Sequence, residues 1–519
     1  MHDYARFLLE TWASIVTKRL SSRNRCANAG ETAAGSLSRL QFMKPLSLVL
    51  VLASFTFPGI SPRVSGEETY PWKASVAVSD ITPQEMTWMS GYAARKGPAE
   101  SVLQPVFVKV LTLEDGEGSR FVFVTMDLIG VPREFRDQVE KTAREKHGIE
   151  PGALLINASH THSGPMIRVY TPPGGGSPRA PYANIPEDQQ ELRVRQTLEY
   201  QQFVATTVDQ LIGKTIESLA PAHLSFSRAR CGFAMNRRTP VGPGSWKNSP
   251  NPDAPVDHEV PVLQVRTADR ESLKAVLFGY SCHATVLSLM QISGDWPGFA
   301  QQYFEEDHPG TVAMFLNGCS GDQNPYPRRL LVYAQRHGRN MATAVEAALQ
   351  TPAVELAGPI RSALAWEDIP YQEPPTEAAL REKAKSSDRY DARHAQFLLD
   401  VLVKEGGFPE TYPVPVQAVR FGSGLSVVAI GGEVVIDYAI RLKQDIGEIT
   451  GAPVWVAGYS NDVMTYIPSR RVLEEGGYEG GGAMRYVRST VHPAHWDPSI
   501  EERLVGRAVD LVRSFPSDP

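Results

Sequence analysis

The most constraining feature of the sequence is an ordered series of apolar runs between residues 105 and 160. Two β-branched and aromatic runs, 105–113 and 121–130, are joined by the turn-like segment EDGEGS and predict two strands. Residues 133–148 form an amphipathic helical pattern that ends at a glycine, and GALLINASH at 152–160 predicts the next strand. This order predicts an α/β fold with mixed β-sheets and flanking helices.

The rest of the chain mixes helical and strand-like patterns in the same way. A long helix is predicted over 187–219, with Phe203 among the residues at core spacing. A charged, helix-rich insert is predicted at about 375–406, and 425–445 predicts a strand, a tight Gly-Gly turn and a helix. Residues 170–186 are too rich in proline and glycine for regular structure, and their place after the strand at 152–160 suits a wall or a lid.

The N-terminal 66 residues have a different character. Residues 44–59 contain an apolar core that is too short to span a bilayer but has the length of a signal-peptide core, and Met43 directly precedes them. We therefore predict that residues 1–42 are an over-called leader and that 43–66 are a signal peptide. A mature protein exported to the periplasm or the exterior would then form a single large domain, 67–519. A buried N-terminal helix is the alternative.

Charge and cysteine content exclude some classes of protein. The formal net charge is −6, and no long basic stretch occurs, so nucleic acid is not an expected partner. Of the four cysteines, Cys26 lies in the predicted leader, which leaves Cys231, Cys282 and Cys319. Three cysteines exclude a disulfide scaffold and leave one bridge open, without indicating the pair.

Two histidines two residues apart, His160 and His162, end the strand predicted at 152–160. Side chains two positions apart in a strand point to the same side, so the two imidazoles can share a metal, or one can bind it while the other acts on a substrate. Two polar residues that cap a buried strand are the alternative. His283 also follows an apolar strand, in FGYSCHATVL, and is either a further ligand or a core histidine. Three histidines in helical patterns are predicted to face solvent: His147, His337 and His394.

The segment ASHTHSGP at 158–165 resembles the THTHSGP signature of the neutral/alkaline (non-lysosomal) ceramidases, zinc-dependent amidases that hydrolyse ceramide to sphingosine and fatty acid. The resemblance extends from about residue 79 to 482. Eight further segments occur in the family's order, and such a series is specific where one motif would be weak. The further segments are GYA at 91–93, FVTMDLIG at 123–130, MNRR at 235–238, YSCHAT at 280–285, SGDWPGFA at 293–300, NGCSGDQNP at 317–325, GGEVV at 431–435, and NDVMTYIPS with GGYEGG at 461–481.

The resemblance implies a zinc site. His160 and His283 would be ligands, and Glu433 and Tyr466 would complete the shell. Glu433 follows a strand and a Gly-Gly turn at a predicted helix start, where a carboxylate stabilised by the helix dipole is the alternative. Tyr466 by itself is an ordinary strand aromatic. His162 would lie near the metal, placed to exchange a proton or to stabilise an oxyanion.

The resemblance also implies further catalytic residues. Arg237 matches the family's active-site arginine, with Arg238 as the alternative inward-facing side chain, and Asp322 matches the acidic residue of the Gly-Asp loop. Where the family has GDVSPN this chain has GDQNPY, so the family's active-site serine falls on Asn324. An amide is no nucleophile but can donate a hydrogen bond to a substrate oxygen. A metal-water route does not need the serine, so hydrolysis survives the change and ceramide specificity stays open.

These features predict a zinc-dependent amidohydrolase resembling neutral ceramidase, in which metal-activated water hydrolyses the N-acyl amide of ceramide or a related N-acyl lipid. A lipid-like substrate is compatible with transient membrane contact, although the sequence shows no amphipathic membrane helix. The family's C-terminal immunoglobulin-like domain is not expected, and no oligomeric state is indicated. Three alternatives stay open: the same scaffold acting on a different amide or ester, a TIM-barrel metal amidohydrolase, and an exported protein that binds zinc without catalysis.

Overall fold

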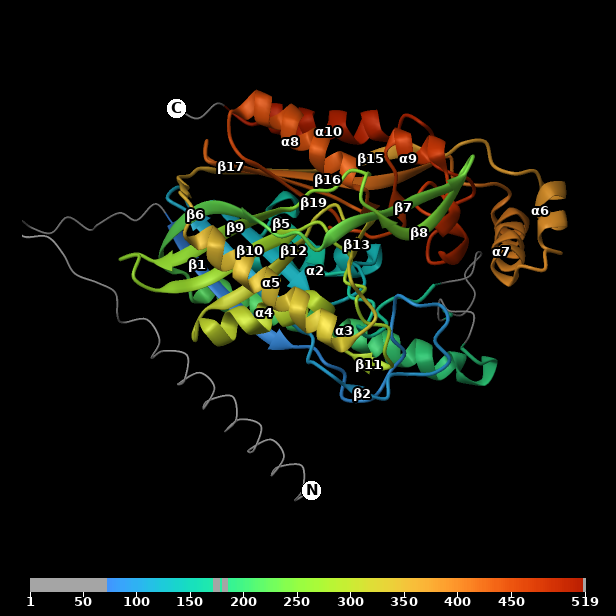
Figure 1. The fold of residues 1–519 in the computed structure, drawn as a ribbon, viewed down its shortest axis with the longest axis horizontal. Helices are drawn as coiled ribbons and strands as arrows, with labels where there is room; N and C mark the ends of the chain where they lie inside the picture. The colour runs from blue at the N-terminus through green and yellow to red at the C-terminus, as the bar shows by residue number, and fades with distance from the viewer. Residues whose placement is uncertain (1–71, 171–177, 180–184, 517–519) are drawn as a thin grey trace, which may run out of the picture. The chain divides into compact units, whose positions relative to one another are not determined.

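The computed structural model describes residues 72–170, 178–179 and 185–516, which lie within one compact unit, Glu67–Pro519. The predicted leader and signal peptide lie outside the described residues, as does most of the proline- and glycine-rich segment after Tyr170. Two β-sheets, each covered by helices, form the centre of this unit (Figure 1). The predicted mixed α/β fold is therefore confirmed.

The larger sheet is mixed and has nine strands. Its main path runs β12-β10-β9-β6-β1-β3-β4-β5, and β14 pairs with β6. The pairs β4–β5 and β10–β12 are parallel and the others antiparallel. The bounds are β1 Trp72–Asp80, β3 Phe107–Asp115, β4 Arg120–Met126, β5 Leu154–Ala158, β6 Ala220–Arg230, β9 Glu259–Thr267, β10 Leu273–Tyr280, β12 Val312–Asn317 and β14 Val354–Glu355.

The second sheet has the order β15-β16-β17-β19, with β17 and β19 parallel. Its strands are β15 Ile360–Pro370, β16 Thr411–Phe421, β17 Leu425–Ile430 and β19 Val454–Ala457. Three smaller pairings are β2 with β11, β7 with β8 and β13, and β18 with β20. Their bounds are β2 Ser101–Val102, β7 Ala234–Gly242, β8 Ser245–Asn251, β11 Gln291–Ile292, β13 Gln323–Pro325, β18 Glu433–Val434 and β20 Tyr466–Ile467.

Helices cover the outer faces of both sheets (Figure 1). Those on the larger sheet are α2 Arg133–His147, α3 Gln190–Glu217, α4 Asp295–Asp307 and α5 Leu331–Leu349, and those on the second sheet are α8 Ile436–Thr450 and α10 Ile500–Ser514. The remaining α-helices of the described chain are α6 Glu377–Lys383, α7 Arg389–Glu405 and α9 Arg470–Glu475. Among the described residues, no helix combines the length and apolar character that crossing a membrane requires.

The inner faces of the two sheets pack on each other. Phe123 of the larger sheet stacks on Phe421 of the second, with ring centroids 6.3 Å apart, and both are buried. Burying side chains of this size stabilises the fold by about 2 kcal/mol each. On the outer face, Tyr200 of α3 is buried as predicted, but Phe203 is 45% exposed. The prediction for Phe203 was wrong because the buried stripe of α3 continues through Val204.

The carboxyl ends of several strands meet at one place. The backbone N–H of Asn317, at the end of β12, donates to Oδ1 of Asn157 in β5 at 2.9 Å. The Asn157 amide in turn donates to the carbonyl of Gly458, which follows β19, at 2.8 Å. The two edge strands of the larger sheet are thereby joined to the second sheet, and polar side chains gather where these strands end.

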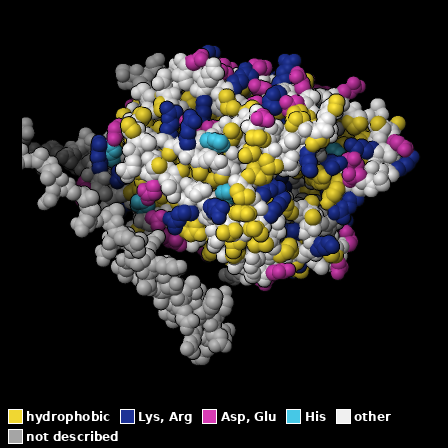
Figure 2. Space-filling model, in the orientation of Figure 1, with side chains coloured by type: hydrophobic (Ala, Val, Ile, Leu, Met, Phe, Trp, Pro, Cys, Tyr) yellow, Lys and Arg dark blue, Asp and Glu magenta, His cyan; other side chains and the backbone are white. Residues whose placement is uncertain are grey.

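Acidic and basic side chains are interspersed on the face seen in Figure 2, with apolar side chains gathered between them. All three cysteines of the described chain are buried free thiols. The bridge that the sequence left open is therefore absent among Cys231, Cys282 and Cys319.

Candidate active site

The histidine motif after β5 leaves the strand in a left-handed turn. β5 ends at Ala158, and His160 has a φ of 60°, a region that residues other than glycine seldom occupy. The predicted alternation along a strand is therefore not what brings His160 and His162 together. The imidazole of His160 is fixed by Nδ1–H, which donates to the carbonyl of Ile129 at 2.6 Å. Its Nε2 atom is left facing the site.

His283, which follows β10, is held in the same way. Its Nδ1–H donates to the carbonyl of Ser320 at 2.5 Å, and its own carbonyl accepts a hydrogen bond from the indole N–H of Trp296 at 2.9 Å. An imidazole whose Nδ1 is the donor carries a lone pair on Nε2. His160 and His283 therefore both present an acceptor nitrogen to the same space, which is the arrangement of metal-binding histidines.

A short parallel pairing brings Glu433 beside Tyr466. These residues are paired in β18 and β20, and α8 begins only at Ile436, so Glu433 is not the first residue of a helix. Oε2 of Glu433 lies 3.2 Å from Nε2 of His160 and 3.3 Å from Nε2 of His283. The hydroxyl of Tyr466 lies 3.4 Å from Nε2 of His283. The four residues predicted as zinc ligands thus converge.

His162 belongs to the same cluster. Its Nε2 lies 3.1 Å from Nε2 of His160, and the ligand nitrogens of His160, His162 and His283 all lie within 4.8 Å of one another. Its Nδ1 is buried and has no hydrogen-bond partner among the described residues. Gly91, with a φ of 97°, lies so close that a Cβ there would approach the ring to 2.5 Å. A glycine at position 91 makes room for the imidazole.

The donor set fits a zinc ion. Nitrogen and oxygen ligands about 2.0–2.1 Å from a tetrahedral zinc lie roughly 3.3 Å from one another. The separations of 3.2 and 3.3 Å that join Oε2 of Glu433 to Nε2 of His160 and of His283 are close to that value. Imidazole nitrogens and a carboxylate oxygen are also the ligands that zinc takes in hydrolases. The residues present can therefore hold the metal.

The electrostatics of the cluster favour the metal-binding protonation state. Burial, reinforced by the charge of Arg237, lowers the pKa of His283 to about 3. Burial also lowers the pKa of His162 well below its ordinary value, with His160 and His283 adding to the effect. Burial alone would raise the pKa of Glu433, but the neighbouring imidazoles outweigh it and hold that pKa well below its usual range. Neutral imidazoles and an ionised carboxylate are the forms that bind metal.

Arg237, rather than Arg238, faces the cluster. Its guanidinium donates from Nη2 to the hydroxyl of Tyr466 at 2.9 Å and from Nε to Glu479 at 2.8 Å. Arg238 points away: it donates to Glu479 at 2.8 Å and to Glu475 at 3.0 Å. The sequence left the choice between the two arginines open, and the contacts of Tyr466 decide it.

Residues 72–328 match the family described as neutral/alkaline non-lysosomal ceramidase, N-terminal. The chain belongs to the neutral/alkaline non-lysosomal ceramidase family. It is accordingly a ceramidase-like hydrolase. Antiparallel pairs in both sheets also exclude the TIM-barrel alternative.

Solved ceramidase structures share the fold. The crystal structure of neutral ceramidase from Pseudomonas aeruginosa gives a TM-score of 0.64 at 18% identity, over 86% of this chain and 76% of that chain. A structure described as ceramidase complexed with C2 gives a TM-score of 0.62 at 18% identity, over 87% and 76% of the respective chains. No curated protein matches this chain in sequence. The fold of the family is therefore retained at low sequence identity.

The two predicted catalytic residues of the Gly-Asp loop lie behind the cluster. Asp322 accepts hydrogen bonds from the side chain of Asn236 at 2.7 Å and from the backbone N–H of Ile436 at 2.9 Å, so it ties the loop to the start of α8. Asn324, at the position of the family's serine, accepts from Thr285 at 3.2 Å and from Nη1 of Arg237 at 3.4 Å. Both are fully buried, and their contacts support Arg237 and α8.

A cavity of about 160 Å³ opens beside the cluster, and His160, His162, Glu433, Tyr466 and Tyr478 contribute to its wall. A small group placed there would lie next to the imidazoles of His160 and His162, the carboxylate of Glu433 and the phenol of Tyr466.

Sequence reasoning missed two residues of this ceramidase-family site. Tyr459 has a φ of 51°, and its hydroxyl donates to Oε2 of Glu433 at 3.5 Å. Glu479 binds Arg237 and so orients the arginine that holds Tyr466. Glu479 lies within the quoted GGYEGG motif, so its position was available, but its role as the partner of Arg237 had no sequence signal. Tyr459 lies outside every quoted motif.

Proposed function

We propose that the protein is a zinc-dependent hydrolase that cleaves the N-acyl amide bond of ceramide or a related N-acyl lipid. The observation that carries the proposal is the convergence of two imidazoles on one carboxylate. Oε2 of Glu433 lies 3.2 Å from Nε2 of His160 and 3.3 Å from Nε2 of His283. Zinc, when bound, polarises a carbonyl and lowers the pKa of water that it coordinates. Membership of the ceramidase family supports an amide as the bond that is cleaved.

The chain's own residues supply the remaining chemistry. Burial raises the pKa of Tyr466 well above its usual value, so the phenol keeps its proton and serves as a hydrogen-bond donor to the developing oxyanion. Arg237 holds that phenol in place through the 2.9 Å hydrogen bond. His162, neutral at rest, is placed to accept a proton from the attacking water and to pass it to the departing amine.

The exact substrate is part of the proposal. Asn324 stands where the family has a serine, which favours a related hydrolase acting on a different amide or an ester as the second candidate function. A binding protein that keeps zinc without catalysis is the third. We also propose that residues 43–66 direct export, which N-terminal sequencing of the mature protein from the periplasm or medium would test.

The decisive experiment combines metal analysis with hydrolysis of a substrate panel. The purified protein should contain about one zinc per chain, and a chelator should abolish hydrolysis of ceramide or a simpler N-acyl amine, with zinc restoring it. His160→Ala should lose both metal and activity. An active, metal-free His160→Ala variant would contradict the proposal. Turnover of esters alone would select the second candidate, and zinc without turnover of any amide or ester the third.

A further inference from the structure

The wall of the catalytic cavity carries two arginines besides the metal-binding cluster. Arg168 and Arg488 both line the cavity of about 160 Å³ that His160 and Glu433 also line, and both arginines are only partly buried. Among the described residues of this wall, Glu433 is the one acidic side chain, and it faces the histidine cluster. The positive charges of the wall therefore outnumber its negative charge even before a metal is bound.

Arg168 has hydrogen-bond donors that no protein group uses. Its Nη2 donates to the carbonyl of Val463, and its side chain makes no other hydrogen bond or ion pair with a described residue. Its Nε and Nη1 are not among the buried, unpartnered atoms of the described chain, so they are accessible to a ligand. Asp462 lies within range of its charge, but that carboxylate is already bound by Arg133 at 2.7 Å. A guanidinium with accessible N–H groups matches the two oxygens of a carboxylate.

Arg488 is held against an aromatic ring. Its guanidinium lies 4.6 Å from the centre of the Tyr170 ring and donates to the Tyr170 hydroxyl at 3.3 Å. Burial lowers the pKa of Arg488, and the charge of Arg179 adds to that effect, although Tyr170 opposes it. A negative charge beside the guanidinium would favour its charged form and so oppose both effects.

A third arginine adds positive charge beside Arg488. Arg393 of α7 makes no side-chain hydrogen bond or ion pair with any residue that the structure describes. Burial lowers the pKa of Arg393 to about 10, and the charge of Arg488 contributes to the shift. Tyr170 packs on the same helix, with its ring centroid 6.3 Å from that of Phe397. An anion next to Arg488 would therefore be stabilised by Arg393 as well.

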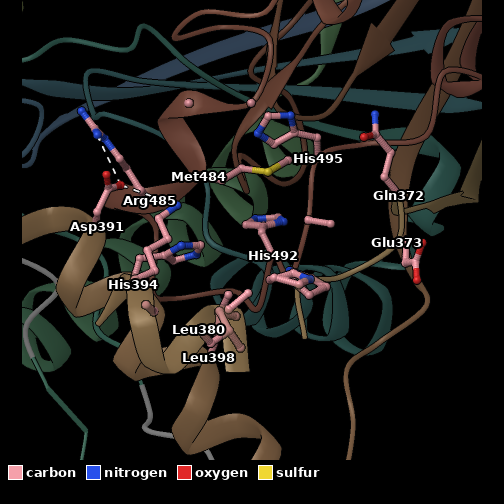
Figure 3. A pocket seen from close by; sticks show the side chains of 18 of the residues that line it. Gln372, Glu373, Leu380, Asp391, His394, Leu398, Met484, Arg485, His492 and His495 are labelled. Carbon is pink, nitrogen blue, oxygen red and sulfur yellow. Dashed lines mark hydrogen bonds and ion pairs between the residues drawn. The ribbon is translucent and has the colours of Figure 1, made fainter. Parts of the chain in front are cut away.

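A neighbouring cavity of about 660 Å³, between the α6–α7 insert and the C-terminal part of the chain, has balanced charges (Figure 3). In its wall Arg485 donates to Asp391 at 3.3 Å, Lys383 lies 3.8 Å from the same carboxylate, and Glu373 supplies a second negative charge. His394, which was predicted to face solvent, lies in this wall and is only 9% exposed, because α7 packs this face against the C-terminal part. The excess of positive charge thus belongs to the catalytic cavity and not to the whole region.

The catalytic cavity suits a small charged group better than an alkyl chain. A saturated chain would cover the guanidinium groups without pairing them, which costs free energy. A volume of about 160 Å³ is also below that of sites for drug-sized ligands, so it holds a compact group next to the metal-binding residues. The compact end of an N-acyl amide is its amine part, and the acyl chain would extend away from the arginines.

We propose that Arg168 and Arg488 form a subsite for a carboxylate on the amine part of the substrate, so that the preferred substrates are N-acyl amino acids. This inference rests on the proposed amide hydrolysis, because the two arginines share a cavity with the residues assigned to the metal. One water adds its oxygen to the carbonyl carbon, the C–N bond breaks and the leaving nitrogen takes a proton. The products are a fatty acid and the free amino acid.

The test compares two amides that differ only in one terminal group. N-octanoylglycine ends in a carboxylate, and N-octanoylglycinamide ends in a neutral amide. The zinc-loaded full chain should release octanoate from N-octanoylglycine with a kcat/KM about tenfold higher or more. Arg168→Gln and Arg488→Gln should each lower the ratio of the two kcat/KM values about fivefold or more, mainly by raising KM for the anionic amide.

Arg381→Gln is the matched control, because this exposed arginine of α6 lines neither cavity. It should leave the ratio unchanged. All three variants should hydrolyse N-octanoylglycinamide at nearly the wild-type rate, which shows that the fold and the metal cluster are intact. A ratio lowered by Arg381→Gln as much as by Arg168→Gln would overturn the subsite.

Calorimetric binding of two ketone analogues, in which a methylene replaces the amide nitrogen, separates the subsite from catalysis. The purified protein should bind 4-oxoundecanoic acid more tightly than 4-oxoundecanamide, and Arg168→Gln and Arg488→Gln should reduce the difference. If neither amide is hydrolysed but this difference is found, the proposed hydrolysis fails and the subsite stands. Equal kcat/KM values for the two amides would overturn the subsite. So would binding to phosphatidylglycerol vesicles that depends on Arg168 and Arg488 without any preference between the ketones, because the arginines would then serve a lipid surface.

Discussion

Two buried polar clusters lie next to each other in this protein, and they differ in how their charges are matched. In the arginine cluster, Glu479 binds both Arg237 and Arg238 at 2.8 Å, and Glu475 binds Arg238 again. In the histidine cluster, three imidazole nitrogens gather within 4.8 Å, and Oε2 of Glu433 lies among them. In the arginine cluster, each charged side chain is paired with an opposite charge from the same chain. The histidine cluster instead brings imidazole lone pairs together with a negatively charged carboxylate.

The comparison indicates what each cluster is for. A buried guanidinium pair with two carboxylates stabilises a fixed geometry, because every charge has a partner and removing one partner costs several kcal/mol. Converging lone pairs around a carboxylate are stabilised only by a cation from outside. Tyr466 joins the two clusters, since its hydroxyl contacts both Arg237 and His283. The arginine cluster can therefore position the phenol of Tyr466 beside the histidine cluster.

The largest effect is expected when the charge of the histidine cluster is removed. Glu433→Gln keeps the size of the side chain, but a neutral amide is a poor zinc ligand, so zinc affinity should fall by at least about 100-fold and hydrolysis should become hard to detect. Competition with a fluorescent chelator measures the affinity. Glu475→Gln, in the other cluster, is the matched control and should keep zinc. If Glu433→Gln retained wild-type zinc affinity, the histidine cluster would not be the metal site.

The fold was largely predictable because its elements carry periodic signals. The strands at 105–113 and 121–130 and the helix at 133–148 formed close to the predicted bounds as β3, β4 and α2. Their β-branched runs and amphipathic stripe are local properties that packing did not override. The order of the strands within the sheets had no such signal, since pairings such as β1 with β6 join distant segments.

The arrangement of the site residues was less predictable than their identity. The motif match named His160, Glu433 and Tyr466, but nothing local indicated that the two-residue strands β18 and β20 would pair Glu433 with Tyr466. Strands of that length show no alternation. His160 and Tyr459 likewise adopt a positive φ that their residue types do not predict, because the surrounding packing imposes this conformation. Burial of His394 depends on how α7 packs, which its own sequence does not determine.

A pair of conservative substitutions sharpens the comparison further. Arg237→Lys cannot bridge Glu479 and Tyr466 at once, so kcat should fall roughly 100-fold and the free energy of unfolding should drop by about 1–3 kcal/mol. Arg238→Lys loses contacts to Glu479 and Glu475 without touching the phenol, so the free energy of unfolding should drop by about 1–3 kcal/mol with kcat nearly unchanged. Steady-state kinetics and thermal unfolding measure both. The reverse pattern would show that Arg238, and not Arg237, serves catalysis.

The smallest effect is expected at Asn324, which links the arginine cluster to the Gly-Asp loop. Asn324→Ser restores the residue that the family has, but the shorter side chain cannot keep the contacts to Arg237, Thr285 and Asn248 together. We expect unfolding free energy to fall by about 1 kcal/mol and kcat by a few-fold, through looser positioning of Arg237. Hydrolysis by the variant should remain abolished by a chelator, because a serine there would act on a site that still needs its metal. If Asn324→Ser instead raised kcat/KM for ceramide tenfold without changing that for a simple N-acyl amine, the residue would contact the substrate rather than position Arg237.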